Sequence, residues 1–167
     1  MSHLPIESAG LLVRDERGDY RPASADEVLS EARKVIAKRV KRGTSFTSPQ
    51  IAREFLTLKL GDREHEVFVL VMLDSQHRLI NTLEMFRGTI DGAAVYPREV
   101  VKEALAHNAA AVILAHNHPS GVAEPSAADR ALTERLKAAL TLVDVRVLDH
   151  LVIAGTDVTS FSERGLL

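Results

Sequence analysis

The spacing of apolar residues predicts two helices in the first third of the chain. Residues 24–43 begin with a capping box formed by Ser24 and Glu27, and their apolar positions then recur at helical spacing. Residues 48–61 begin with a serine cap followed by Pro49, which favours a second helix with one apolar face. Both segments are therefore expected to be amphipathic helices.

Short apolar runs further along the chain predict the strands of a sheet. Residues 67–73 form a continuous run rich in Val and Leu, too short for a helix and typical of a buried strand. Further strands are expected at 79–86, 109–115 and 145–153, with helices at about 97–108 and 127–140. This order favours an α/β fold in which helices flank a mixed β-sheet.

The N-terminal part of the chain has a weaker pattern than the rest. Residues 1–23 mix short apolar pieces with Asp, Gly and Pro, which indicates a frayed arm or a small hairpin. We therefore expect residues 1–46 to form an N-terminal arm with one amphipathic helix, and residues 47–167 to form a single compact domain.

Composition and charge narrow the classes of function. The 167 residues carry a net charge of −2, so no overall positive field attracts nucleic acid or an anionic membrane. The chain has no Cys, so a metal would have to be held by His, Asp or Glu. Neither a membrane-spanning run nor a signal-peptide pattern is apparent, which favours a cytoplasmic protein without a membrane partner.

The segment AHNHPSGVAEPSAAD, residues 115–129, carries the chemistry of the chain. His116 and His118 are two residues apart at the end of a predicted strand, so their imidazoles point to the same side. Asp129 falls in the first turn of the next predicted helix, where its carboxylate can turn back towards them. Two His and one carboxylate form a typical catalytic zinc set, although Ser126 with Asp129 is also what simple helix capping requires.

The same segment resembles the JAMM metalloproteases, also called JAB or MPN-plus proteins. Their pattern begins with His, any residue, His and Pro, which here are residues 116–119. A serine follows seven residues after the proline, here Ser126, and an aspartate follows after two intervening residues, here Asp129. The surrounding stretches FRGTIDGAAVYPREVVKEALAHNAAAVILAHNHPSG, SAADRALTERLK and VLDHLVIAG are similar to the RadC-like branch. The resemblance extends over about residues 47–167 and implies a JAB/MPN domain with a cytidine-deaminase-like layered architecture.

This resemblance implies a role for each matching residue. His116, His118 and Asp129 would bind one Zn²⁺ ion, and Ser126 would help to hold the tetrahedral intermediate. Glu66 matches the upstream glutamate that acts as general base in the family. The implied activity is that of a zinc metallopeptidase or isopeptidase acting on a peptide or protein substrate.

Elementary chemistry supports a carboxylate base in such a site. Zinc lowers the pKa of a bound water to about 7, and a nearby carboxylate can take its proton and pass it to a leaving amine. Glu64 lies two residues from Glu66 and is an alternative base, while solvated charge at a strand edge would explain either residue without a function. His150, in the last predicted strand, is either an outer donor to the site or a satisfied strand histidine.

A second class of function is a non-catalytic scaffold or a nucleic-acid module linked to DNA repair. The first predicted helix carries a basic run: Arg33, Lys34, Lys38, Arg39, Lys41 and Arg42. No aromatic residues interleave this run, which favours a solvated helix face. Residues 1–46 also lack the helix-hairpin-helix pattern of full-length RadC proteins, and Tyr96 stands where many RadC-like sequences have histidine.

Overall fold

The computed structural model describes residues 11–14, 17–39, 42–46, 48–88 and 95–167. The chain divides into two compact units, residues 1–39 and residues 40–167. Among the described residues, none of the helices has both the length and the apolar character needed to cross a membrane.

The N-terminal unit contains a hairpin followed by a helix. Strands β1 (Leu12–Arg14) and β2 (Tyr20–Pro22) pair antiparallel, and α1 spans Ala25–Arg39. The predicted capping box is confirmed, because the Glu27 amide donates to the Ser24 hydroxyl and the Ser24 amide donates to the Glu27 carboxylate. Of the two alternatives for residues 1–23, the described part forms the hairpin.

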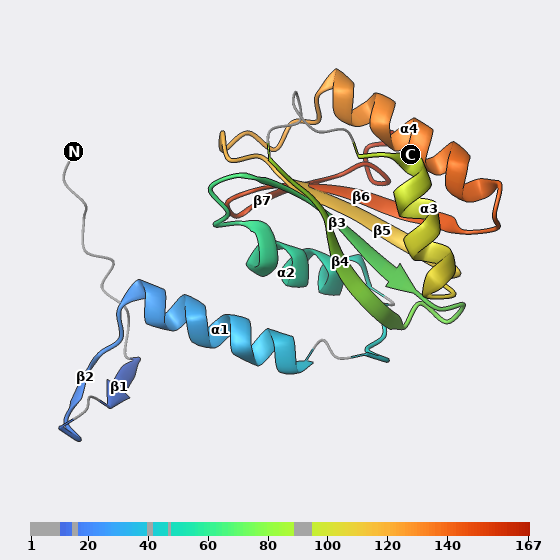
Figure 1. The fold of residues 1–167 in the computed structure, drawn as a ribbon. Helices are drawn as coiled ribbons and strands as arrows, with labels where there is room; N and C mark the ends of the chain where they lie inside the picture. Colours follow the sequence, from blue (N-terminus) through green and yellow to red (C-terminus); the bar gives the residue numbers. More distant parts are fainter. Residues whose placement is uncertain (1–10, 15–16, 40–41, 47, 89–94) are drawn as a thin grey trace. The chain divides into compact units, whose positions relative to one another are not determined.

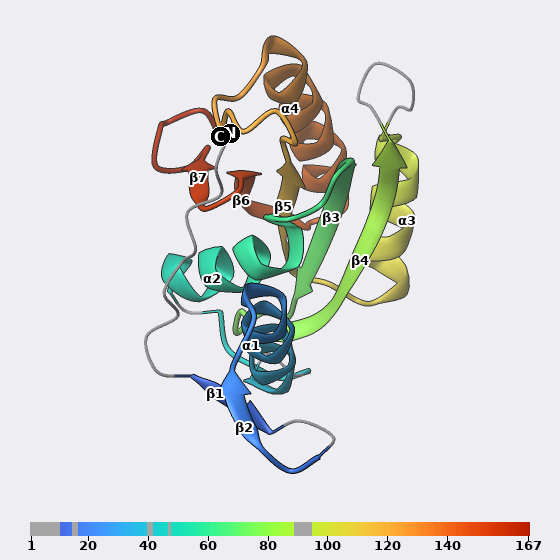
Figure 2. The same ribbon diagram turned by 90° about the vertical axis from the view of Figure 1, so that its left-hand side faces the viewer.

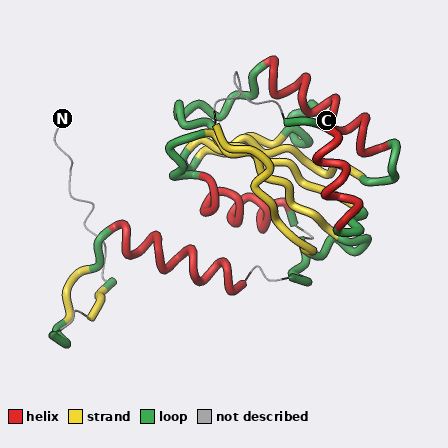
Figure 3. Tube along the Cα trace, viewed as in Figure 1, coloured by secondary structure: helices red, strands yellow, loops and turns green. Residues whose placement is uncertain are grey.

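The second unit is an α/β domain, as the sequence predicts (Figure 1). Its elements are α2 (Pro49–Leu60), β3 (Glu66–Leu73), β4 (Leu79–Gly88), α3 (Pro97–Ala106), β5 (Ala111–Asn117), α4 (Ala127–Thr141), β6 (Arg146–Ala154) and β7 (Asp157–Ser160). The strands form one five-stranded sheet in the order β4-β3-β5-β6-β7, in which only β5 and β6 are parallel. Figure 3 shows helices on both sides of this sheet.

Side-chain alternation along the strands creates two apolar layers. Val67, Val69 and the other odd-numbered residues of β3 pack with α2, whereas Phe68, Leu70 and Met72 pack with α3 and α4. Figure 2 shows α2 on one side of the sheet and α3 and α4 on the other. His116 follows Val112 and Leu114 on β5, so the alternation directs it into the layer that contains α4.

Two differences from the sequence-based expectation concern strands β5 and β7. β5 continues to Asn117 rather than ending at residue 115, so His116 lies inside the strand. β7 was not predicted at all, because only Val158 and the partly apolar Thr159 give it a strand signal. Its backbone is instead fixed by antiparallel pairing with β6.

Candidate metal centre

The end of β5 and the first turn of α4 bring three side chains together. His116 lies in β5, His118 follows the strand, and Asp129 is the third residue of α4. His116 Nε2 lies 3.0 Å from His118 Nε2 and 3.2 Å from Asp129 Oδ1, and His118 Nε2 lies 3.5 Å from Asp129 Oδ2. The side chains of His116 and Asp129 are each 1% exposed, and that of His118 is 16% exposed, so one side of the cluster reaches solvent.

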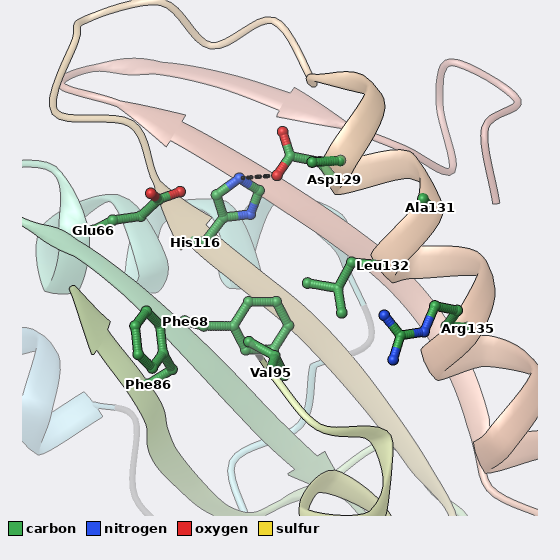
Figure 4. Close-up of a pocket in the computed structure, with 10 residues that line it drawn as sticks. Glu66, Phe68, Phe86, Val95, His116, Asp129, Ala131, Leu132 and Arg135 are labelled. Carbon is green, nitrogen blue, oxygen red and sulfur yellow. Dashed lines mark ion pairs between the residues drawn. The ribbon is translucent and has the colours of Figure 1, made fainter. Parts of the chain in front are cut away.

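Glu66 approaches the same cluster from the neighbouring strand. It is the first residue of β3, which pairs with β5. Its carboxylate and the ring nitrogens of His116 and His118 lie within 4.8 Å of one another, so these three residues could hold a metal ion. Figure 4 shows Glu66 and Asp129 on opposite sides of the His116 ring. Glu64, the alternative base, precedes β3 and is exposed, so it does not lie on the strand that carries Glu66.

The loop after β5 determines which nitrogen of His118 carries hydrogen. His118 Nδ1 lies 2.8 Å from the carbonyl oxygen of Val122. A carbonyl oxygen can only accept a hydrogen bond, so Nδ1 of His118 must be the donor. In the neutral ring, the lone pair of Nε2 therefore faces Asp129 and His116, as a metal ligand requires.

A chain of buried hydrogen bonds likewise determines which nitrogen of His116 carries hydrogen. The Thr133 hydroxyl donates to the Asp129 carbonyl oxygen at 2.6 Å, so the 2.6 Å contact between Thr133 Oγ1 and His150 Nδ1 requires His150 to donate. Burial lowers the pKa of His150 well below its ordinary value, so the ring is neutral and its Nε2 accepts. His116 Nδ1, 2.9 Å away, must then donate, which leaves the His116 Nε2 lone pair facing the cluster.

The electrostatics of the cluster favour a positive charge between these groups. Two ring lone pairs face each other at 3.0 Å, and Asp129 Oδ1 is buried without a hydrogen bond to any described residue. When a proton takes the place of this cation, the hydrogen bond that it forms with Asp129 raises the pKa of His118 despite burial. Burial acts to raise the pKa of Asp129, but hydrogen bonds from the protonated His116 and His118 rings and from Ser126 outweigh it and keep this pKa well below its ordinary range. The nitrogen and oxygen donors thus fit a cation such as zinc.

Ser126 holds Asp129 in place. It is the N-cap of α4, and its hydroxyl accepts from the Asp129 amide at 3.1 Å. Asp129 Oδ2 in turn accepts from the Ser126 amide at 2.7 Å and from the Ser126 hydroxyl at 2.6 Å. The capping and metal-site interpretations of this pair therefore coexist, because the reciprocal cap directs the second carboxylate oxygen towards the histidines.

Asn117 is a functional candidate that sequence reasoning missed. Its buried side chain accepts from the Val67 amide at 2.8 Å and donates to the carbonyl oxygens of Arg63 and His65 at 3.2 and 3.0 Å. These bonds attach the start of β3, and with it Glu66, to the end of β5. The family pattern allows any residue at this position, so only the pairing of the two strands could have identified it.

Tyr96 and the basic run are not among the residues that form the cluster. Tyr96 is 55% exposed at the start of α3 and contacts the Arg98 guanidinium, 5.5 Å from its ring centre. In the basic run, Lys34 pairs with Glu31 at 3.1 Å. Lys38, Arg39 and Lys41 lie outside the side chains that the structure describes.

Comparison with known proteins assigns the domain to a family. Residues 46–166 match the sequence profile of the RadC-like JAB domain. The chain belongs to this family. Methylibium petroleiphilum has a similar protein, UPF0758 protein Mpe_A2695, which is 59% identical over 150 residues that cover 90% of this chain and 68% of the relative.

Two further relatives show that the similarity is not confined to one genus. A UPF0758 protein of Aeromonas hydrophila is 55% identical over 90% of this chain and 67% of its own length. One from Leptothrix cholodnii is 53% identical over 98% of this chain and 74% of its own length. The RadC-like JAB domain therefore contains every residue of the candidate metal centre, and the names of these relatives specify no reaction.

Proposed function

We propose that this RadC-like JAB domain is a zinc-dependent hydrolase that cleaves an amide bond in a peptide or protein. The observation that carries the proposal is the convergence of His116, His118 and Asp129 on one point, with the carboxylate of Glu66 beside them. Two neutral imidazoles and one carboxylate are a common ligand set for catalytic zinc, which leaves a position for water.

Two carboxylates compete for the third ligand position, and their surroundings favour Asp129. Asp129 approaches the histidine nitrogens to 3.2 and 3.5 Å, and the Ser126 cap holds it there. Glu66 comes from the opposite side and lines a cavity next to the cluster. Asp129 thus suits a fixed ligand, and Glu66 suits a group that must meet substrate.

Different residues of the site would then have different roles in hydrolysis. When bound, zinc supplies Lewis acidity, which acidifies water and polarises the amide carbonyl. Glu66 would take a proton from the attacking water and deliver it to the leaving nitrogen. We assign Ser126 the support of the developing oxyanion, for which its hydroxyl turns its one hydrogen from Asp129 Oδ2 to the substrate while the Ser126 amide keeps its bond to Asp129 Oδ2.

The first experiment measures metal content and turnover in matched variants. Purified protein is expected to contain close to one zinc per chain, and His118→Ala and Asp129→Ala are expected to lose it. Glu66→Gln should retain zinc and lose about 10²- to 10⁴-fold in the rate of amide cleavage, the usual contribution of a general base. Glu64→Gln is the matched control, because Glu64 is exposed and precedes β3.

Two outcomes would contradict the proposal. Folded wild-type protein that binds no zinc after supplementation would rule out the metal centre. Equal loss of turnover in Glu64→Gln and Glu66→Gln would rule out Glu66 as the specific base. The first outcome would leave the scaffold or nucleic-acid alternative.

A further inference from the structure

A cavity of about 280 Å³ opens directly beside the metal centre. Glu66, His116 and Asp129 lie at one end of it (Figure 4). Its walls are mainly apolar and come from three elements and a loop: Phe68 of β3, Phe86 of β4, Val95 before α3, and Leu132 of α4. Because ligand pockets usually measure about 300–1,000 Å³, this one suits a single side chain more than a large ligand.

The other end of the cavity carries a positive charge. Arg135 lines the cavity from α4, and Figure 4 shows its guanidinium directed to the side on which Leu132 lies. Asp129, Leu132 and Arg135 follow one another at three-residue intervals along α4, and all three line the cavity. The six-residue step from Asp129 to Arg135 corresponds to about 9 Å along the helix axis.

Arg135 differs from most arginines of this domain in having no partner among the described residues. Arg130, on the same helix, pairs with Glu124 at 3.8 Å, and Arg164 pairs with the same glutamate at 2.5 Å. Arg63 pairs with Glu84 at 3.1 Å. An exposed guanidinium beside an apolar cavity is therefore available to a ligand.

We propose that the cavity selects peptides that have an apolar side chain next to the cleaved bond and a carboxylate that binds Arg135. The inference rests on the proposed amide hydrolysis and specifies its substrate class. An extended peptide advances about 3.3 Å per residue, so the 9 Å step places the carboxylate about three residues from the bond. A side-chain carboxylate and a C-terminal carboxylate share this chemistry, since arginine binds either through two parallel hydrogen bonds.

Charge and shape together favour this substrate over its alternatives. A basic peptide would bring a like charge to Arg135, and a wholly polar one would leave the walls formed by Phe68, Phe86 and Leu132 without apolar contact. At the opposite end of the cavity, the carboxylates of Glu66 and Asp129 balance the two positive charges of a bound Zn²⁺ ion, so the uncompensated positive charge is that of Arg135. The cavity therefore orients the peptide as well as selecting it.

The test measures binding without turnover, using zinc-loaded Glu66→Gln protein and isothermal titration calorimetry. The probes are N-acetylated peptides with one Leu, followed three residues later by Asp, Asn or Lys with an amidated end, or by a free C-terminal carboxylate. We expect either carboxylate peptide to bind about tenfold or more tightly than the Asn peptide, as for a hydrogen bond between charged groups. A preference for Asp alone or for the free terminus alone identifies which source the site uses.

Substitutions at Arg135 separate this inference from the proposed function. Arg135→Ala should abolish the preference for a carboxylate, Arg135→Glu should transfer it to the Lys peptide, and Arg130→Ala is the matched control that should keep it.

Wild-type protein that cleaves amides with the same selectivity as Arg135→Ala would overturn the inference and leave the proposed hydrolase function intact. If the wild type binds peptides in an Arg135-dependent manner but cleaves none of them, the peptide-binding role of the cavity would stand and the proposed hydrolase function would be overturned. Arg135-dependent binding of a short single-stranded oligonucleotide in place of all peptides would also overturn the inference.

Discussion

Thr133 is a buried residue of α4 that decides, through His150, which nitrogen of His116 carries hydrogen. Thr133→Val keeps the shape of the side chain and removes the hydroxyl, so His150 Nδ1 loses its buried partner. We expect zinc affinity to fall about 10–100-fold, the usual effect of losing an outer partner of a metal ligand. Competition with a chelator at fixed pH measures this change.

Two control variants show whether the hydroxyl itself is responsible. Thr133→Ser retains the hydroxyl and should bind zinc within a few-fold of the wild type. Thr82→Val removes a buried hydroxyl that makes no hydrogen bond with a described residue, and it should not change zinc affinity. Unchanged affinity in Thr133→Val would show that His116 keeps its orientation without this chain of bonds.

Asn117 links Glu66, the proposed base, to the proposed ligands on β5, and its removal should separate zinc binding from turnover. Asn117→Ala leaves the buried Val67 amide without its partner, which costs about 1–3 kcal/mol of stability. His116 and His118 keep their own hydrogen bonds to His150 and Val122, so zinc should be retained. Turnover should fall, because Glu66 is no longer held at the end of β5.

Urea unfolding, zinc content and cleavage rate of Asn117→Ala test this expectation together. Asn81→Ala is the control, since Asn81 bonds to His107 and the Thr82 amide on edge strand β4. It is expected to lose stability without a specific loss of turnover. Loss of zinc from Asn117→Ala would instead assign Asn117 to the metal centre.

At the scale of elements, local sequence signals predicted the helices well because the residues that form a helix cap lie within a few positions of one another in the sequence. Ser24 and Ser48 both act as N-terminal caps in the structure, as their sequence context predicts. The edge strand β7 depends on pairing with β6, a contact between segments that no local pattern reports. The same distinction explains why the His116–Asp129 pattern could be found and Asn117 could not, since its partners lie about fifty residues earlier in the chain.

The turn between β3 and β4 provides a test that depends on pH. Asp74 accepts hydrogen bonds from the amides of Arg78 and Gln76 and from Arg78 Nε, and these bonds lower its pKa below the ordinary value. A lowered pKa stabilises the fold above the pKa of the unfolded chain, about 3.9, and this stabilisation is lost as pH falls through the folded pKa. Asp74→Asn should therefore be less stable than wild type near neutral pH, with a difference that begins to fall near pH 4 and disappears below the folded pKa.

Thermal unfolding of both proteins from pH 7 to pH 2.5 measures this difference. In an Arg78→Ala background the effect of Asp74→Asn should be smaller, because one charged donor is gone. A difference that stays constant down to the lowest pH would show that the carboxylate charge does not stabilise the turn.

For the whole molecule, the site is built from positions that are distant in sequence but all lie in the second unit. Three elements that meet at one end of the sheet provide Glu66, His116, Asp129 and Thr133, and a fourth element provides His150. The sequence indicated His116, His118 and Asp129 as candidate ligands because they fall in one short segment. It could not predict the cavity or the free Arg135, because these arise only when α4 packs on β3.

The position at which the folded domain begins is a prediction about the whole molecule. The compact unit starts near residue 40, whereas the sequence-based boundary lies between residues 46 and 47. Residues 43–46 bond to the start of β4 and to the turn before it: the Gly43 amide donates to Leu79, the Leu79 amide to Thr44, and the Phe46 amide to His77. Phe46 is 5% exposed and packs edge-on against Phe55, with ring centres 6.0 Å apart.

A fragment of residues 42–167 should therefore fold and bind zinc like the full chain, and a fragment of residues 47–167 should be much less stable. Loss of a buried phenylalanine alone costs about 3–5 kcal/mol, a large share of the roughly 5–15 kcal/mol that stabilises a domain. Phe46→Ala in the longer fragment is the control and should reproduce most of this loss, which thermal unfolding by circular dichroism measures.

Equal unfolding temperatures for the two fragments would place the boundary after Phe46. Zinc affinity should be unchanged wherever a fragment folds, because every residue of the metal centre lies between Glu66 and His150.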